Sequence, residues 1–71
     1  MDMDALLHAA VHAGKLLLEN GAETYRVEET MVRIVRSFRV DDAQSFVTPT
    51  VVMLSITMDG KTGSYIQRVQ N

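Results

Sequence analysis

Apolar residues recur at helical spacing through the first twenty residues of the chain. At about 100° per residue, one face of this segment gathers the apolar side chains and the opposite face is polar. The apolar face consists of Leu6, Leu7, Ala10, Val11, Gly14, Leu17 and Leu18. Gly14 lies within that face, where the lack of a side chain lets a second helix approach closely. We predict an amphipathic helix over residues 3–20, with Asp2 or Asp4 capping its first turn.

A helix stop and a second helix follow. Asn20 and Gly21 are the residue types that most easily adopt the left-handed conformation of helix ends. After them, apolar residues again recur at helical spacing, at Val27, Met31, Ile34, Val35 and Phe38. Two glutamates lie near the start of this run and three arginines near its end, which suits the helix dipole. We predict a second amphipathic helix over residues 24–38, capped by Thr24.

From Gln44 onward the period shortens and β-branched residues dominate, which favours strands over residues 44–48, 51–58 and 64–69. In the middle strand Val52, Leu54, Ile56 and Met58 share one face, so the helices should cover that face. The other face is only partly apolar. Pro49 cannot donate to a ladder and marks a bend, a bulge or an edge. The glycine-bearing segment 59–63 suits a hairpin.

The predicted fold is α+β, with two amphipathic helices packed on a three-stranded, mostly antiparallel sheet. The 71 residues form one soluble domain or a fragment of a larger domain. A core of this size supplies roughly 3–5 kcal/mol of net stability, so we expect support from a partner or from further chain beyond residue 71.

Composition excludes several classes of protein. The chain has no cysteine, so disulfide frameworks and thiolate metal clusters are impossible. A net charge of −2 gives no general attraction to phosphate, and we predict no nucleic-acid binding. The four glycines are too scattered for a nucleotide-binding loop. The longest apolar run, Val51–Leu54, is far too short for a bilayer, and the acidic amino terminus is unlike a signal peptide.

The first helix carries a weak metal-site pattern. Asp4, His8 and His12 recur every four residues on its polar face, a spacing that lets side chains converge on one cation. The zinc-protease pattern has a glutamate directly after the first histidine, whereas Ala9 stands here. A solvated helix face is the simpler interpretation, and we predict no metal and no cofactor. A metal-responsive regulator using His8 and His12 stays a minor alternative.

The start of the second helix holds a charged cluster. Glu23, Arg26 and Glu28 could bind a polar ligand or act as an ion-paired helix cap. Hydroxyl groups occur at Thr48 and Thr50, but no histidine is arranged to activate them as nucleophiles. We therefore predict that the chain is not an enzyme.

Two separate motifs resemble a known family. They are residues 13–31, AGKLLLENGAETYRVEETM, and residues 46–50, FVTPT. In order and spacing they are similar to the amino-terminal domain of the threonine/serine exporter family, and the resemblance covers nearly the whole chain. The matching motif positions are Gly14, Asn20, Gly21, Glu23, Arg26, Glu28, Thr48, Pro49 and Arg68.

The resemblance implies a soluble cytoplasmic domain that precedes a multi-helix membrane portion. In that family the membrane portion exports small hydrophilic metabolites such as threonine and serine, and related two-component members are linked to dicarboxylate export. It implies a location at the cytoplasmic face of the bacterial plasma membrane, a membrane portion in the same or a partner chain, and a homo-oligomer. Assembly, gating or substrate capture are the expected roles. Glu23, Arg26, Glu28, Thr48, Thr50 and Arg68 are the candidate substrate-binding or gating residues, and Gly14, Asn20, Gly21 and Pro49 the structural ones. The alternative is a small ligand-binding or enzymatic domain that uses Glu23, Arg26 and Glu28.

Overall fold

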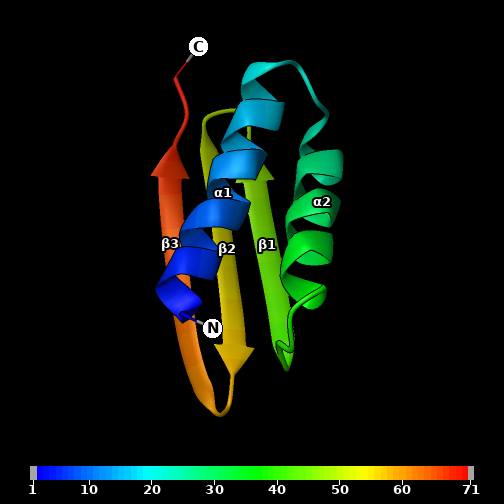
Figure 1. Ribbon diagram of the computed structural model, residues 1–71. Coiled ribbons are helices and arrows are strands. Elements are labelled where there is room, and N and C mark those ends of the chain that lie inside the picture. The colour runs from blue at the N-terminus through cyan, green and yellow to red at the C-terminus, as the bar shows by residue number, and fades with distance from the viewer. Residues whose placement is uncertain (1, 71) are drawn as a thin grey trace.

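The computed structural model describes residues 2–70 as two layers (Figure 1). Two helices come first, α1 (Met3–Glu19) and α2 (Thr24–Arg36). Three strands follow, β1 (Asp42–Thr48), β2 (Val51–Met58) and β3 (Lys61–Arg68). Both helices lie on the same face of the sheet, α1 over β2 and β3 and α2 over β1. The predicted α+β class is confirmed.

The sheet is antiparallel throughout, in the order β1-β2-β3. The β1–β2 register runs from Asp42 opposite Thr57 to Thr48 opposite Val51. The β2–β3 register runs from Val51 opposite Arg68 to Met58 opposite Lys61. Because side chains alternate along a strand, this register divides the sheet into a face covered by the helices and a face that neither helix touches. We call the second one the open face.

The core lies between the helices and the covered face. Val52 and Leu54 of β2 are 0% exposed and Ile56 is 1% exposed, which confirms their predicted orientation, whereas Met58 near the hairpin is only partly buried. The helices contribute the other large apolar side chains that are fully or almost fully buried: Leu7, Val11, Val27, Met31 and Val35.

Helix α1 begins at the predicted residue and ends close to the predicted one. Asp2 caps it, since its carboxylate accepts a hydrogen bond from the backbone N–H of Asp4 at 3.0 Å. At the other end Gly21 has a φ of +89°, the left-handed conformation predicted for this stop. Asn20 itself has a φ of −98° and is the C-cap, so the helix ends one residue earlier than predicted. Leu17, predicted to be in the core, is 36% exposed, because it lies on the margin of the buried face.

Two predictions about α2 are wrong. Glu23 occupies the N-cap position, without a side-chain cap hydrogen bond, and Thr24 is already helical. The helix ends at Arg36 instead of residue 38, and the Ser37 hydroxyl donates to the carbonyl of Ile34 at 2.6 Å. Phe38 therefore lies outside the helix and is 37% exposed. The turn at Ser37 breaks the helical spacing that would have brought Phe38 onto the core.

Gly14 marks the predicted crossing of the helices. A Cβ atom added at Gly14 would lie 2.7 Å from Sδ of Met31 and 3.2 Å from Cγ1 of Val27, both on α2. The first distance is shorter than real Cβ contacts and the second is tight, so a larger residue would force Met31 to move, and glycine lets the two helices pack this closely without that shift.

The middle strand has its predicted bounds, Val51–Met58, whereas the other two are longer than predicted. β1 begins at Asp42 instead of Gln44, and β3 spans Lys61–Arg68 instead of 64–69. The β2–β3 connection is a two-residue turn in which Asp59 and Gly60 both have positive φ, 51° and 78°. Such turns match the twist of the flanking strands, so the ladder continues up to the turn and takes in residues that sequence alone assigned to a loop.

Candidate functional site

The structure does not bring the predicted charged cluster together. Glu23 and Arg26 are exposed, and the Arg26 guanidinium lies 6.0 Å from the centre of the Tyr25 ring. Within residues 2–70 the ion pair that meets a 4.0 Å limit joins Lys15 to Glu19, both on α1. Glu23 and Arg26 therefore project from the start of α2 as separate solvated groups.

Glu28 instead connects α2 to the edge of the sheet. Its Oε2 accepts a hydrogen bond from the backbone N–H of Val47 at 2.9 Å, and its backbone carbonyl accepts one from the Ser45 hydroxyl at 3.2 Å. A carboxylate bound to a backbone N–H is a charge-assisted hydrogen bond. The hydrogen bond to Val47 gives this carboxylate a structural role. No ligand is therefore needed to explain a charged residue at this position.

Thr48, Pro49 and Thr50 form the β1–β2 turn. The Thr48 hydroxyl accepts hydrogen bonds from the backbone N–H groups of Thr50 and Val51, at 3.2 and 3.1 Å. The Thr50 carbonyl accepts one from the backbone N–H of Val69 at 2.8 Å. Pro49 lies at the turn between the paired residues Thr48 and Val51, which confirms the predicted bend. The local role of both threonines is thus to shape the turn.

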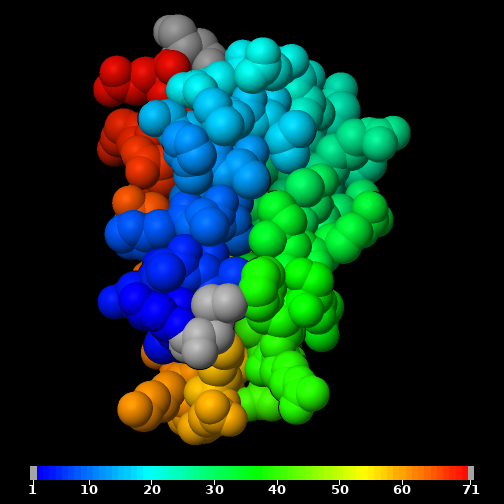
Figure 2. Space-filling model, in the orientation of Figure 1, coloured from blue at the N-terminus to red at the C-terminus, as the bar shows by residue number. Residues whose placement is uncertain are grey.

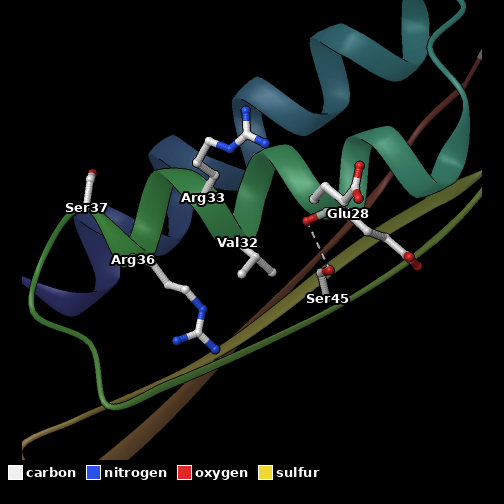
Figure 3. Close-up of a pocket in the computed structure, with 7 residues that line it drawn as sticks. Glu28, Val32, Arg33, Arg36, Ser37 and Ser45 are labelled. Atoms are coloured by element: carbon white, nitrogen blue, oxygen red, sulfur yellow. Dashed lines mark hydrogen bonds between the residues drawn. The ribbon is translucent and has the colours of Figure 1, made fainter.

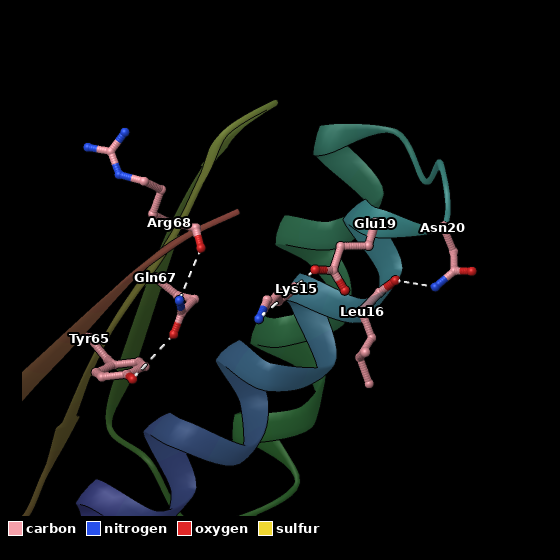
Figure 4. A network of polar contacts seen from close by, with 7 residues as sticks. All are labelled: Lys15, Leu16, Glu19, Asn20, Tyr65, Gln67 and Arg68. Atoms are coloured by element: carbon pink, nitrogen blue, oxygen red, sulfur yellow. Dashed lines mark hydrogen bonds and ion pairs between the residues drawn. The ribbon is translucent and has the colours of Figure 1, made fainter. Parts of the chain in front are cut away.

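Arg68 lies at the end of β3, opposite Val51, and is exposed. Figure 4 shows its guanidinium pointing away from the α1 residues Lys15 and Glu19. Its backbone carbonyl accepts a hydrogen bond from the Gln67 amide at 3.0 Å. Arg68 borders a depression with Lys15 and Glu19, whereas Glu23 borders a different one with Thr24 and Pro49.

The polar face of α1 lies alongside β3. His8 stacks on Tyr65 with ring centroids 4.0 Å apart and the planes tilted by 33°. His8 and His12 border one depression beside β3. Asp4 lies near the β2–β3 hairpin. The described residues contain no group of three or more histidine, aspartate or glutamate side chains placed to hold a metal ion. His8 thus has a packing partner on the neighbouring strand.

A broad groove runs between α2 and β1. It is lined by Glu28, Glu29, Val32, Arg33, Arg36, Ser37 and Ser45. Figure 3 shows Val32 and Arg36 pointing from the helix toward the strands, whereas Arg33 and Ser37 point away from them. Arg36 and the apolar side chain of Val32 thus lie side by side in an open depression, and the arginine suits a small polar molecule with a carboxylate. The Ser45 hydroxyl already donates to the Glu28 carbonyl.

The open face of the sheet carries the most exposed apolar side chains of the strands. Phe46 is opposite Met53, and Met53 is opposite Ile66, so the three form one row across β1, β2 and β3. Phe46 is 56% exposed and Ile66 is 62% exposed. We call these residues the apolar row. On the same face, one flank of the row is polar, with Gln44, Ser55 and Ser64, and the other has Thr48 and Arg68 on either side of the apolar Val51.

The sequence analysis identified neither the apolar row nor the groove. The alternation in β2 placed Met53 on the second face, but Phe46 and Ile66 lie in other strands and join it only through the register. Counting outward from the two turns would have found that register, since each turn fixes which residues are opposite. Most of the groove residues lie on α2 or at its end, and only Ser45 comes from β1. The sequence does not indicate that β1 packs beside this side of the helix, and that packing forms the groove.

Comparison with known proteins identifies a family. Residues 8–71 match the ThrE family, described as "Putative threonine/serine exporter". Neither the curated proteins nor the solved structures compared with the chain gave a match. No helix among residues 2–70 is long and apolar enough to cross a membrane.

Proposed function

Because the chain belongs to the threonine/serine exporter family, with 64 of its 71 positions matched between residues 8 and 71, we propose that it is a soluble domain through which such an exporter is assembled. In this role it binds the membrane portion of the exporter, in the same or a partner chain, at the cytoplasmic face of the membrane. The family is a transporter family, and the proposal gives the chain no catalytic step.

The observation that carries the proposal is the apolar row on the open face. Phe46 and Ile66 leave more than half of their surfaces exposed. On the covered face, Ala43 and Val47 of β1 are buried and Tyr65 of β3 is partly buried. Exposed apolar patches rimmed by polar groups are typical of interaction sites. The hydroxyls and amides around the row suit the rim of an interface that forms and separates.

The proposal is tested with Phe46→Ser in cells that produce the exporter containing this chain. Ser replaces the largest exposed side chain of the row without touching the core. We expect export of threonine and serine to fall and less of the domain to be recovered with its membrane portion. Asp42→Ser, on the same face and strand but outside the residues that flank the row, is the matched control and should change neither. Equal export and equal recovery for Phe46→Ser would overturn the proposal.

A second candidate function, substrate capture, is favoured by the groove between α2 and β1. Arg36 points into it beside Val32, and Ser45 lines it. An arginine can bind a substrate carboxylate through paired hydrogen bonds, and the nearby Glu29 has the charge to attract a substrate ammonium group. Of the charged residues considered from the sequence, this candidate site includes Glu28 but neither Glu23 nor Arg26.

Calorimetric titration with threonine, serine and succinate tests this candidate. We expect Arg36→Ala to abolish a saturable heat that the unaltered chain gives. Arg26→Ala removes the same charge from the same helix outside the groove and should leave the binding constant unchanged. If Arg26→Ala abolishes binding and Arg36→Ala does not, the site lies at the start of α2. If the unaltered chain gives no heat, substrate capture by this domain is excluded.

A further inference from the structure

The two edges of the sheet differ in how their backbone groups are protected. Along β1, Glu28 binds the outward N–H of Val47, and the Ser45 hydroxyl ties the strand to α2. Along β3, no helix among residues 2–70 lies beyond the strand (Figure 1). The Arg68 carbonyl accepts a hydrogen bond from the Gln67 amide at 3.0 Å, which leaves its second lone pair for another donor. Figure 2 shows atoms of β3, in orange and red, at the margin of the molecule. An unprotected edge strand is a template for pairing with another strand.

The register identifies which β3 groups point outward. Residues opposite each other in antiparallel strands alternate between hydrogen-bonded and non-bonded pairs. The N–H of Val47 points away from β2, so its opposite residue Val52 directs its backbone groups toward β3 and pairs with Gln67. The next residues in each direction, Ile66 and Arg68, must therefore point away from β2. By the same alternation Ser64 also points outward.

We propose that two copies of this chain associate through β3, antiparallel and with Ile66 opposite Ile66 of the second copy. The two sheets then form one six-stranded sheet, with all helices on one face. This partner lies in the plane of the sheet, so the inference goes beyond the proposed docking of the open face and does not depend on it.

The sequence of β3 suits this self-pairing. Ile66, the most exposed large apolar residue of the strands at 62%, meets its own copy on the open face. The apolar row then continues without a break from Phe46 of one copy to Phe46 of the other. Arg68 comes opposite Ser64 of the second copy, so no like charges face each other across the strands, a pairing that would be destabilising.

The charged residues of α1 also favour the antiparallel pairing of two copies through β3. Helix α1 contacts both β2 and β3, and strands lie about 4.8 Å apart. In the proposed pair the two α1 helices are therefore about 10 Å apart, within the usual range for packed helices. They run antiparallel and face each other with their polar faces, which carry Asp4 at one end and Lys15 at the other.

The positions of Asp4 and Lys15, measured along the direction of β3, agree with a two-fold axis at Ile66. His8 stacks on Tyr65, which fixes the two elements at one level. At about 1.5 Å per helical residue and about 3.3 Å per strand residue, Asp4 lies about 9 Å before the level of Ile66 and Lys15 about 7 Å beyond it. A two-fold axis at Ile66 thus places Asp4 of each copy beside Lys15 of the other. The two residues are too far apart within one helix to interact.

The decisive experiment uses two charge variants, Asp4→Lys and Lys15→Glu, in sedimentation equilibrium of the purified chain. Alone, each variant places like charges together at both contacts of the pair, and we expect the dimer dissociation constant to rise about tenfold or more. Mixed in equal amounts, the two variants restore opposite charges at both contacts, and heterodimers should form with nearly the original affinity. Loss of folding cannot produce this recovery.

A second variant tests the strand pairing itself. Ser64→Pro removes an outward N–H from the edge, a place where proline is tolerated, and should make the chain monomeric at concentrations where the original chain is dimeric. Ser64→Thr keeps the N–H and should remain dimeric. A chain that is monomeric at every concentration overturns the proposal. So does a dimer that neither Ser64→Pro nor the charge variants weaken.

Discussion

The two faces of the same three strands show how one sheet serves two purposes. On the covered face Val52 and Leu54 are 0% exposed, packed beneath two helices that approach closely at Gly14. On the open face, one residue away along the same strands, Phe46 and Ile66 are more than half exposed. The covered face therefore stabilises the fold. The open face keeps apolar surface exposed that is not part of the core. Three substitutions separate these roles, in order of decreasing effect on stability.

Leu54→Ala should have the largest effect on folding. Leu54 is fully buried at the centre of the covered face, and such truncations cost about 2–5 kcal/mol through lost transfer energy and a residual cavity. A core of this size supplies only roughly 3–5 kcal/mol in total. We expect the free energy of unfolding, measured in urea, to fall close to zero. A shift of the urea midpoint too small to measure would mean that the covered face is not the stabilising one.

Glu28→Ala should have an intermediate effect at the junction of helix and sheet. It removes the carboxylate that accepts the N–H of Val47 at 2.9 Å, and hydrogen bonds to charged groups contribute about 1.5–3 kcal/mol. Glu28→Gln keeps an acceptor oxygen and should recover part of the loss. Hydrogen exchange at the Val47 amide should speed up in Glu28→Ala more than at the Leu54 amide. Equal stability of all three proteins would contradict the assigned role of Glu28.

Phe46→Ser should have the smallest effect on stability. Its side chain lies on the open face, outside the core, and surface substitutions usually change stability by less than about 0.5 kcal/mol. The thermal midpoint of the purified chain should stay close to that of the original. Taken with the export assay, this result would show that Phe46 matters for binding alone. A large loss of stability would instead make the apolar row part of the folding core.

Local patterns predicted most of the elements. The helical spacing of Val27, Met31 and Val35 and the alternation of Val52, Leu54 and Ile56 correctly assigned the buried faces. The errors lie where a single residue changed the local geometry. The turn at Ser37 carried Phe38 out of its helix. The capping position went to Glu23 instead of Thr24, although glutamate makes no side-chain cap hydrogen bond there.

The candidate site was less predictable. Glu23, Arg26 and Glu28 are neighbours in sequence, but a helix rotates each residue by about 100° from the last, and only the fold revealed that Glu28 binds the edge of β1. The interaction of His8 with Tyr65 also joins residues far apart in the chain. Which polar groups meet depends on how the elements are placed beside each other, and spacing within one element does not contain that information.

The sequence by itself determined the two amphipathic helices, the three strands, the glycine at the helix crossing and the family. Each of these depends on local periodicity, on conformational freedom at one residue, or on motifs along the chain. Only the tertiary structure decided that Phe46, Met53 and Ile66 form one row, and that β1 has a protected edge and β3 an open one. The physical reason is that strand register and helix position are long-range pairings, fixed when the whole core packs and not by any single segment.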